Sequence, residues 1–141
     1  MDESRNGLIP VNPTLLGSPR GYSNGMLAPS GGALLFIAGQ IGWDEHQRLV
    51  GDELIVQFDR ALANLIAVVN EAGGSADQIA RLTIYVTNKD EYRNCSRAVG
   101  EKYRARMGRH FPAMALVEVK SLLEDGAKIE IEGIAVLPAA T

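Results

Sequence analysis

The sequence predicts a two-layer α+β sandwich in which two helices pack on one face of a mixed β-sheet. Two long segments, residues 52–72 and 88–107, repeat apolar residues every three or four positions, as amphipathic helices do. About five shorter segments show the apolar runs or two-residue alternation of strands. The resulting order, β-β-α-β-α-β-β, shows no repeat or linker, so residues 1–141 are interpreted as a single domain.

Length, composition and charge restrict the class of protein. The chain has 141 residues, 46% hydrophobic and 22% charged, as in an ordinary soluble domain. Its net charge of −3 disfavours nucleic acid as the main partner. No apolar run is long enough to cross a bilayer, and residues 1–4 do not resemble a secretory signal. A lone Cys95 allows no intrachain disulfide and the two histidines form no metal motif, so we expect a cytoplasmic protein with no metal and no cofactor.

The elements of the first half can be assigned in order. Residues 1–20 contain three prolines and predict an extended N-terminal arm. Segment 22–27 predicts a short strand, and the apolar run 33–38 between glycines predicts a buried one. Asp52 is the expected N-cap of the first helix, which Gly73 and Gly74 end. Its apolar stripe consists of Leu54, Phe58, Leu62, Leu65, Val69 and Ala72.

The second half continues the alternation. Segment 79–87 predicts a strand, and Asn88 predicts the cap of the second helix, with Glu91 reaching back in a capping box. Segments 113–119 and 128–137 are the last two strands, and the uncovered sheet face is expected to carry Arg81, Thr83, Tyr85, Glu118, Glu130 and Glu132. A half-polar face without helices favours self-association, with a site shared between copies.

The strongest local candidate for chemistry is the run Ile129-Glu130-Ile131-Glu132. Alternation places both carboxylates on one face of a strand. This pattern fits a solvated edge strand. It also fits a carboxylate in a cleft, where burial raises its pKa and lets it handle protons or water. No nucleophile elbow, phosphate-binding loop or dinucleotide fingerprint competes with it.

Several segments taken together resemble a known family. They include Gly21-Tyr22-Ser23, Phe36-Ile37-Ala38-Gly39-Gln40-Ile41, Gly51-Asp52, Leu82-Thr83-Ile84-Tyr85-Val86-Thr87, Pro112-Ala113, Val117-Glu118-Val119 and Ile129-Glu130-Ile131-Glu132. In this order they resemble the Rid family (reactive intermediate deaminase; also YjgF or endoribonuclease L-PSP) across residues 12–137. The resemblance implies a chorismate-mutase-like fold, a homotrimer with ligand clefts between subunits, and hydrolysis of reactive imines and enamines, such as 2-aminoacrylate, to 2-oxo acids and ammonia.

The resemblance also implies roles for particular residues. The glutamate that positions the attacking water corresponds to Glu130, and the cleft tyrosine corresponds to Tyr22. A glycine whose backbone lines the cleft corresponds to Gly39, although the serine before it is Ala38 here. An asparagine that some members supply from the second helix corresponds to Ser96.

The largest departure from the family pattern is at Met114. Where members carry Pro-x-Arg-Ser or Pro-x-Arg-Thr to grip the substrate carboxylate, this chain has Pro112-Ala113-Met114-Ala115. Methionine carries no charge and donates no hydrogen bond. Met114 and Leu116 are therefore expected to hold an apolar substrate body. The cations Arg20, Arg81, Arg109 and Lys120 are either ordinary surface residues or substitutes for the missing arginine.

The sequence is compatible with functions of different classes. The favoured hypothesis is an imine or enamine deaminase whose substrate does not depend on a carboxylate–arginine pair. The alternative is a trimeric small-molecule-binding or regulatory module without catalysis. A third and weaker hypothesis is a ribonuclease. Trp43 either walls the cleft or packs under the next loop, and His110 either reaches the cleft or is a plain loop residue.

Overall fold

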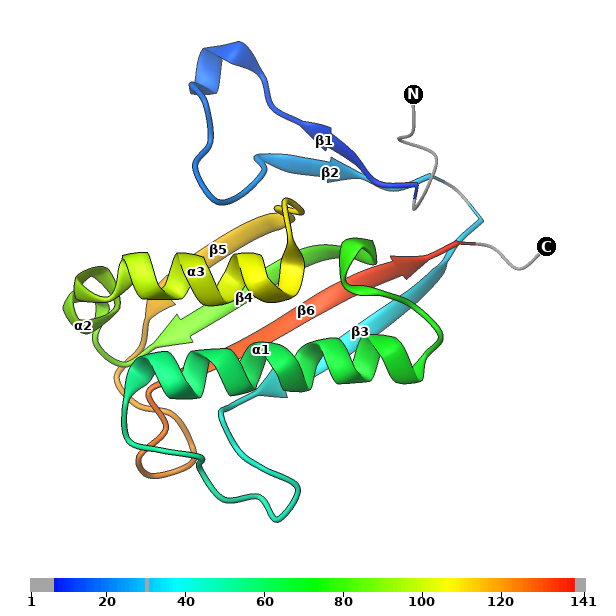
Figure 1. Ribbon diagram of the computed structural model, residues 1–141. Coiled ribbons are helices and arrows are strands. Elements are labelled where there is room, and N and C mark those ends of the chain that lie inside the picture. Colours follow the sequence, from blue (N-terminus) through cyan, green and yellow to red (C-terminus); the bar gives the residue numbers. More distant parts are fainter. Residues whose placement is uncertain (1–6, 30, 139–141) are drawn as a thin grey trace.

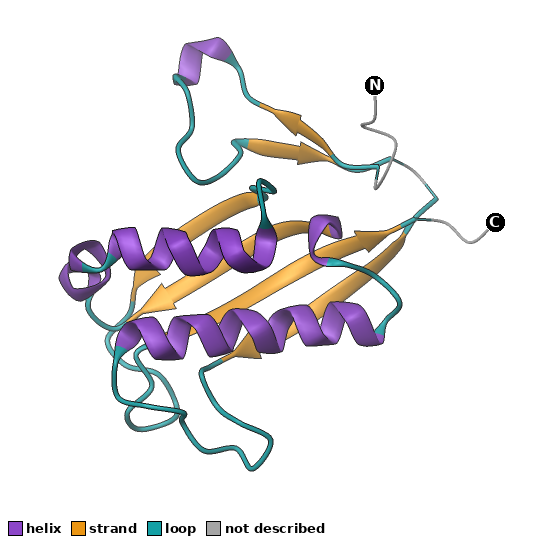
Figure 2. Cartoon of the chain, in the orientation of Figure 1, coloured by secondary structure: helices purple, strands orange, loops and turns teal. Residues whose placement is uncertain are grey.

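The computed structural model describes residues 7–29 and 31–138 and has two layers (Figures 1 and 2). Strands β3 (Ala33–Gln40), β6 (Ile129–Leu137), β4 (Ile79–Val86) and β5 (Ala113–Glu118) form a sheet in the order β3-β6-β4-β5. β6 runs antiparallel to both neighbours, whereas β5 runs parallel to β4, so the sheet is mixed. Helices α1 (Leu54–Glu71) and α3 (Ser96–Met107) cover the same face, which confirms the predicted fold class.

Helix α1 buries the apolar stripe that its sequence predicts. Phe58, Leu62, Leu65 and Val69 are at most 1% exposed because they pack against the sheet. The predicted cap was wrong: Glu53, not Asp52, is the N-cap residue, since its carbonyl accepts the first helical hydrogen bond from the Gln57 N–H at 3.1 Å. Ala72 is exposed, because the helix ends at Glu71 before another turn can face the core.

The second predicted helix is broken at Cys95 into α2 (Lys89–Asn94) and α3. The Asn88 side chain caps α2 as predicted, accepting the Glu91 N–H at 3.0 Å. Glu91 does not reach back as a capping box requires. Its carboxylate instead forms an ion pair at 2.8 Å with the ammonium group of Lys128, the residue just before β6. Cys95 packs partly buried against the core.

The N-terminal segment folds differently from the prediction. The short strand predicted over residues 22–27 is β2 (Gly25–Leu27), which does not join the main sheet but pairs with β1 (Ile9–Val11) in a separate two-stranded sheet. This ribbon stands apart from the two layers, with the 3₁₀ turn η1 (Thr14–Leu16) at its far end (Figure 1). It is attached to the main sheet through a bridge between Ser23 and Ala113. Residues 1–6 of the expected arm lie outside the described residues.

The core lies between the helices and the sheet. A second 3₁₀ turn, η2 (Ala76–Gln78), leads directly into β4. Gln57 is fully buried within the core, and its amide joins α1 to two loops and to the start of β6. Within residues 7–29 and 31–138, no helix is long and apolar enough to cross a membrane.

Candidate functional site

The register of the sheet divides the candidate residues between its two faces. Met114 and Leu116 are paired with the core residues Leu82 and Ile84 in parallel strands, so they share the helix-covered face. Glu130 is paired with Tyr85 and therefore lies on the opposite, open face. The expected position of Glu118 on the open face was wrong, because its partner in the register is the buried Val86.

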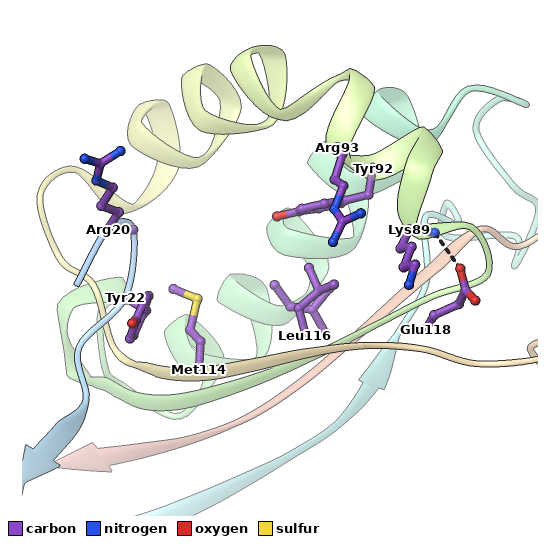
Figure 3. Close-up of a pocket in the computed structure, with 10 residues that line it drawn as sticks. Arg20, Tyr22, Lys89, Tyr92, Arg93, Met114, Leu116 and Glu118 are labelled. Carbon is purple, nitrogen blue, oxygen red and sulfur yellow. Dashed lines mark hydrogen bonds between the residues drawn. The ribbon is translucent and has the colours of Figure 1, made fainter. Parts of the chain in front are cut away.

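A pocket of about 490 Å³ lies on the helix-covered side of β5, and we call it the Met114 pocket (Figure 3). Met114 and Leu116 form its floor, and Tyr92 of α2 lies above them. The complete lining is Arg20, Gly21, Tyr22, Ile84, Lys89, Tyr92, Arg93, Met114, Leu116 and Glu118. An adjoining cavity of about 230 Å³ shares Met114 and Tyr92 and extends to Ser96. Four of the predicted site residues thus gather here: Tyr22, Ser96, Met114 and Leu116.

Tyr22 lies in this pocket because hydrogen bonds hold the next residue, Ser23, in place. Ser23 is 6% exposed, and its N–H donates to the Pro112 carbonyl at 3.0 Å. Its hydroxyl donates to the Phe111 carbonyl at 2.6 Å. These two bonds hold the chain against the start of β5, two residues before Met114, so Tyr22 faces the same space as Met114.

The cations of the Met114 pocket differ from those that the sequence suggested. Arg20 lines it as one of the expected substitutes, but Arg81, Arg109 and Lys120 do not belong to its described lining. Lys89 and Arg93 line it instead, and sequence analysis missed both. Their spacing of four residues on one helix was the available signal, because it places both side chains on one face.

A second pocket of about 310 Å³ lies on the other side of the sheet, and we call it the Glu130 pocket. It is lined by Gly39, Ile41, Trp43, Leu123, Glu124 and Glu130. Gly39 lies within an irregularity of the β3–β6 pairing, between Ile37 and Gln40. A Cβ atom at residue 39 would overlap the Glu130 carboxyl group, lying 2.7 Å from its Cδ. Glycine is therefore required for the carboxylate to lie on the β3 backbone. Trp43 forms part of the wall of this pocket, which is one of the two positions expected for this side chain.

Tyr85 is a neighbour of Glu130 that sequence analysis gave no role. It stands opposite Glu130 in the β4–β6 pairing, with Glu132 two residues further along β6. Partial desolvation and the negative charge of Glu132 raise the pKa of Tyr85, and Glu130 adds to this effect. Its phenol is protonated at neutral pH, as an ordinary tyrosine is, and can donate a hydrogen bond on the face that carries both carboxylates.

His110 makes structural contacts. The His110 Nε2 atom bonds the Ile79 carbonyl at 2.6 Å, and the His110 carbonyl accepts the Tyr103 hydroxyl at 2.6 Å. Histidine 110 thus ties the end of α3 to β4 and does not line either pocket. Over the described part of the chain, no three His, Cys, Asp or Glu residues are grouped so that they could hold a metal ion.

The pattern of matches with known proteins identifies the family. The model of the endoribonuclease L-PSP family matches residues 16–137. The chain belongs to this family. It is the Rid or YjgF family of the sequence resemblance, as a solved structure shows: a Rid-family protein of unknown function from Yersinia pestis is 31% identical, with a TM-score of 0.79 over 93% of this chain and 99% of that one.

Other members of the L-PSP family carry more specific names. A 2-iminobutanoate/2-iminopropanoate deaminase of Salmonella typhimurium is 32% identical over 105 residues, covering 74% of this chain and 80% of that protein. A RutC family protein of Pyrococcus abyssi is also 32% identical, over 74% of this chain and 79% of its own. TdcF of E. coli, solved with bound serine, is 28% identical with a TM-score of 0.63, covering 85% of this chain and 91% of that chain.

Proposed function

We propose that this protein is an imine or enamine deaminase whose site is completed by a neighbouring copy of the chain. The observation that carries the proposal is the division of the candidate residues by the sheet. Tyr22 and Met114 line a pocket on one face, whereas Glu130 and Gly39 line a pocket on the other. One chain cannot direct both groups at one small ligand, but adjacent copies in a homotrimer can.

The open face has the character of a surface that self-associates. On the edge strand β3, Leu34 is 61% and Phe36 71% exposed, and Val117 of β5 is 44% exposed. Leu34 and Phe36 are neighbours on one face of β3, and grouped exposed apolar side chains of this kind are typical of interaction surfaces. Light scattering at micromolar concentration tests this step. A mass of three chains is expected, and a monomer would contradict a shared site.

In the proposed reaction, Glu130 positions a water molecule and accepts its proton while the water oxygen bonds to the imine carbon. The proton passes to the nitrogen. The hydroxyl proton of the resulting carbinolamine then passes to the same nitrogen as the carbon–nitrogen bond breaks and the carbon–oxygen double bond forms, so that a carbonyl compound and ammonia leave. Tyr22 would hydrogen-bond the substrate, the Gly39 backbone would line the cleft, and Met114 with Leu116 would hold the apolar body. The deaminase name of the Salmonella relative supports this class of reaction.

Residue 114 bears both on this proposal and on its main alternative. A methionine cannot form the charge-assisted pair that an arginine makes with a carboxylate. The substrate is therefore one that no arginine at this position has to anchor. The same observation favours the second candidate, a small-molecule-binding or regulatory module without turnover.

A paired hydrolysis assay distinguishes the two candidates. Imines of several amino acids are generated in the assay by an amino-acid oxidase, and both the trapped imine and the 2-oxo acid are followed. Wild type, Met114→Arg and Glu130→Gln are compared with Glu132→Gln, a matched change on the same strand and face. Gain of activity on small imines in Met114→Arg supports the deaminase.

The control variant makes the assignment of Glu130 testable. Loss of turnover in Glu130→Gln but not in Glu132→Gln supports a water-positioning role, provided that both variants keep the mass of wild type. Equal loss in both would refute that role. Inactivity of both wild type and Met114→Arg would favour the binding module.

A further inference from the structure

The Met114 pocket carries a surplus of positive charge on an acidic protein. Among its described lining residues, Arg20, Lys89 and Arg93 are cationic and Glu118 is anionic, whereas the whole chain has a net charge of −3. Three cations against one anion give the pocket a positive local potential. This potential attracts anionic ligands although the protein as a whole is negatively charged.

Lys89 and Arg93 can both bind such an anion. They lie one turn apart on α2, and Figure 3 shows both side chains directed at the end of the pocket between Leu116 and Glu118. The Glu118 carboxylate accepts the backbone N–H of Lys89 at 2.8 Å, and no ion pair of the Lys89 ammonium occurs among the described residues. Arg93 contacts Asp90 at 3.7 Å, with side chains 71% and 77% exposed, which makes this pair weak.

The rest of the pocket is apolar and elongated. Met114, Leu116 and Glu118 are alternate residues of β5, so the floor from Met114 to Glu118 is about 13 Å long. Tyr92 lies above Leu116, and Ile84 lies beside it. An aromatic or branched body fits between these side chains, and a methionine in the floor adapts to its shape.

We infer that the Met114 pocket binds an organic carboxylate with a ring-sized apolar body, its carboxylate between Lys89 and Arg93 and its body on Met114 and Leu116. The carboxylate-binding cations are thus on α2 instead of at residue 114, and the carboxylate lies at the Glu118 end of the pocket. Tyr22, at the other end, then contacts the apolar body and not the imine group, in place of the hydrogen bond proposed above. That this ligand is a substrate rests on the proposed function. The substrate class is then imines of amino acids with large apolar side chains.

Binding is tested with stable compounds, so that it does not depend on turnover. The probe is 3-phenylpropionate, and the controls are the uncharged 3-phenylpropionamide and the short acid propionate. The ¹³C-methyl signals of Met114 and of the leucines are followed by NMR during titration of the full-length protein. We expect the Met114 and Leu116 signals to shift with 3-phenylpropionate, and at least tenfold weaker binding of both controls. Equal binding of the amide would overturn the inference.

Substitution of the cations locates the carboxylate. Lys89→Gln and Arg93→Gln are each expected to weaken binding of 3-phenylpropionate about five- to tenfold, since a charge-assisted hydrogen bond near the surface is lost. Arg97→Gln is the matched control on α3, because Arg97 is exposed and does not belong to the pocket lining. If Arg20→Gln weakens binding while the α2 variants do not, the carboxylate lies at the Tyr22 end and the inference is wrong.

The two proposals fail in different ways. If the probe binds as expected and no imine is hydrolysed, the carboxylate site stands and the deaminase proposal is refuted. If imines are hydrolysed with equal kcat/KM by wild type and by Lys89→Gln and Arg93→Gln, the deaminase stands and the carboxylate site is refuted.

Discussion

Gln57 is the buried polar side chain on which the geometry of the Glu130 strand depends. Its Nε2 group donates to the carbonyls of Gly51 at 2.9 Å and Gly126 at 3.0 Å, and its Oε1 atom accepts the Lys128 N–H at 2.8 Å. The side chain is fully buried, so water cannot replace these partners. Replacing it by methionine, which has a similar length, removes all three bonds while keeping the volume.

The expected cost of Gln57→Met follows from these contacts. Each lost bond costs about 1 kcal/mol, and leaving buried backbone groups unpaired raises the total to about 3–4 kcal/mol. A domain of this size has a free energy of unfolding of about 5–15 kcal/mol, so a large share of the stability is lost. The melting temperature should fall by about 10 °C or more.

Urea denaturation followed by circular dichroism measures this loss directly. The matched control is Gln40→Met, because the Gln40 amide makes one bond, to the Ala38 carbonyl at 3.2 Å, outside the core. Its stability should stay within about 0.5 kcal/mol of wild type. A loss below about 1 kcal/mol in Gln57→Met would show that the three bonds contribute no more than ordinary surface contacts, and would refute this reasoning.

Three further predictions concern the site, the pH dependence of stability and the assembly. Gly39→Ala should lower kcat/KM for imines about a hundredfold by displacing the Glu130 carboxylate, whereas Gly25→Ala, with 3.5 Å to the nearest side-chain atom, should not change it. The hydrogen bonds from Arg106 lower the pKa of Asp59 below its usual 3.8, so this pair stabilises the fold above that pH and the effect is lost as pH falls through the lower value. Asp59→Asn should therefore cost about 0.5–1 kcal/mol in urea denaturation at pH 7 and less at pH 2, because protonation of the Asp59 carboxyl weakens the pair in the wild type. Phe36→Glu should reduce the mass measured by light scattering, because it places a charge on the exposed apolar face. Unchanged kcat/KM, an equal cost at both pH values, or an unchanged mass would contradict the respective prediction.

The sequence alone specifies the elements whose periodicity is local. The stripe from Leu54 to Val69 determines α1, because residues three or four positions apart face one side of any helix. The alternation of Ile79–Val86 determines β4 and its buried face in the same way. The sequence also carries the family resemblance, since it consists of residue identities in order.

The tertiary structure decides everything that depends on pairing between distant segments. The parallel register of β4 and β5 places Met114 and Glu118 on the helix-covered face, while the antiparallel register of β4 and β6 places Glu130 on the other. A shift of one residue would exchange the faces of β5, and its first five residues are all apolar, so its sequence shows no alternation that fixes the register. The tertiary structure likewise brings Lys89 and Arg93 of α2 to the same pocket as Met114 and Leu116 of β5. The chemistry of each pocket therefore follows from contacts between residues far apart in the chain.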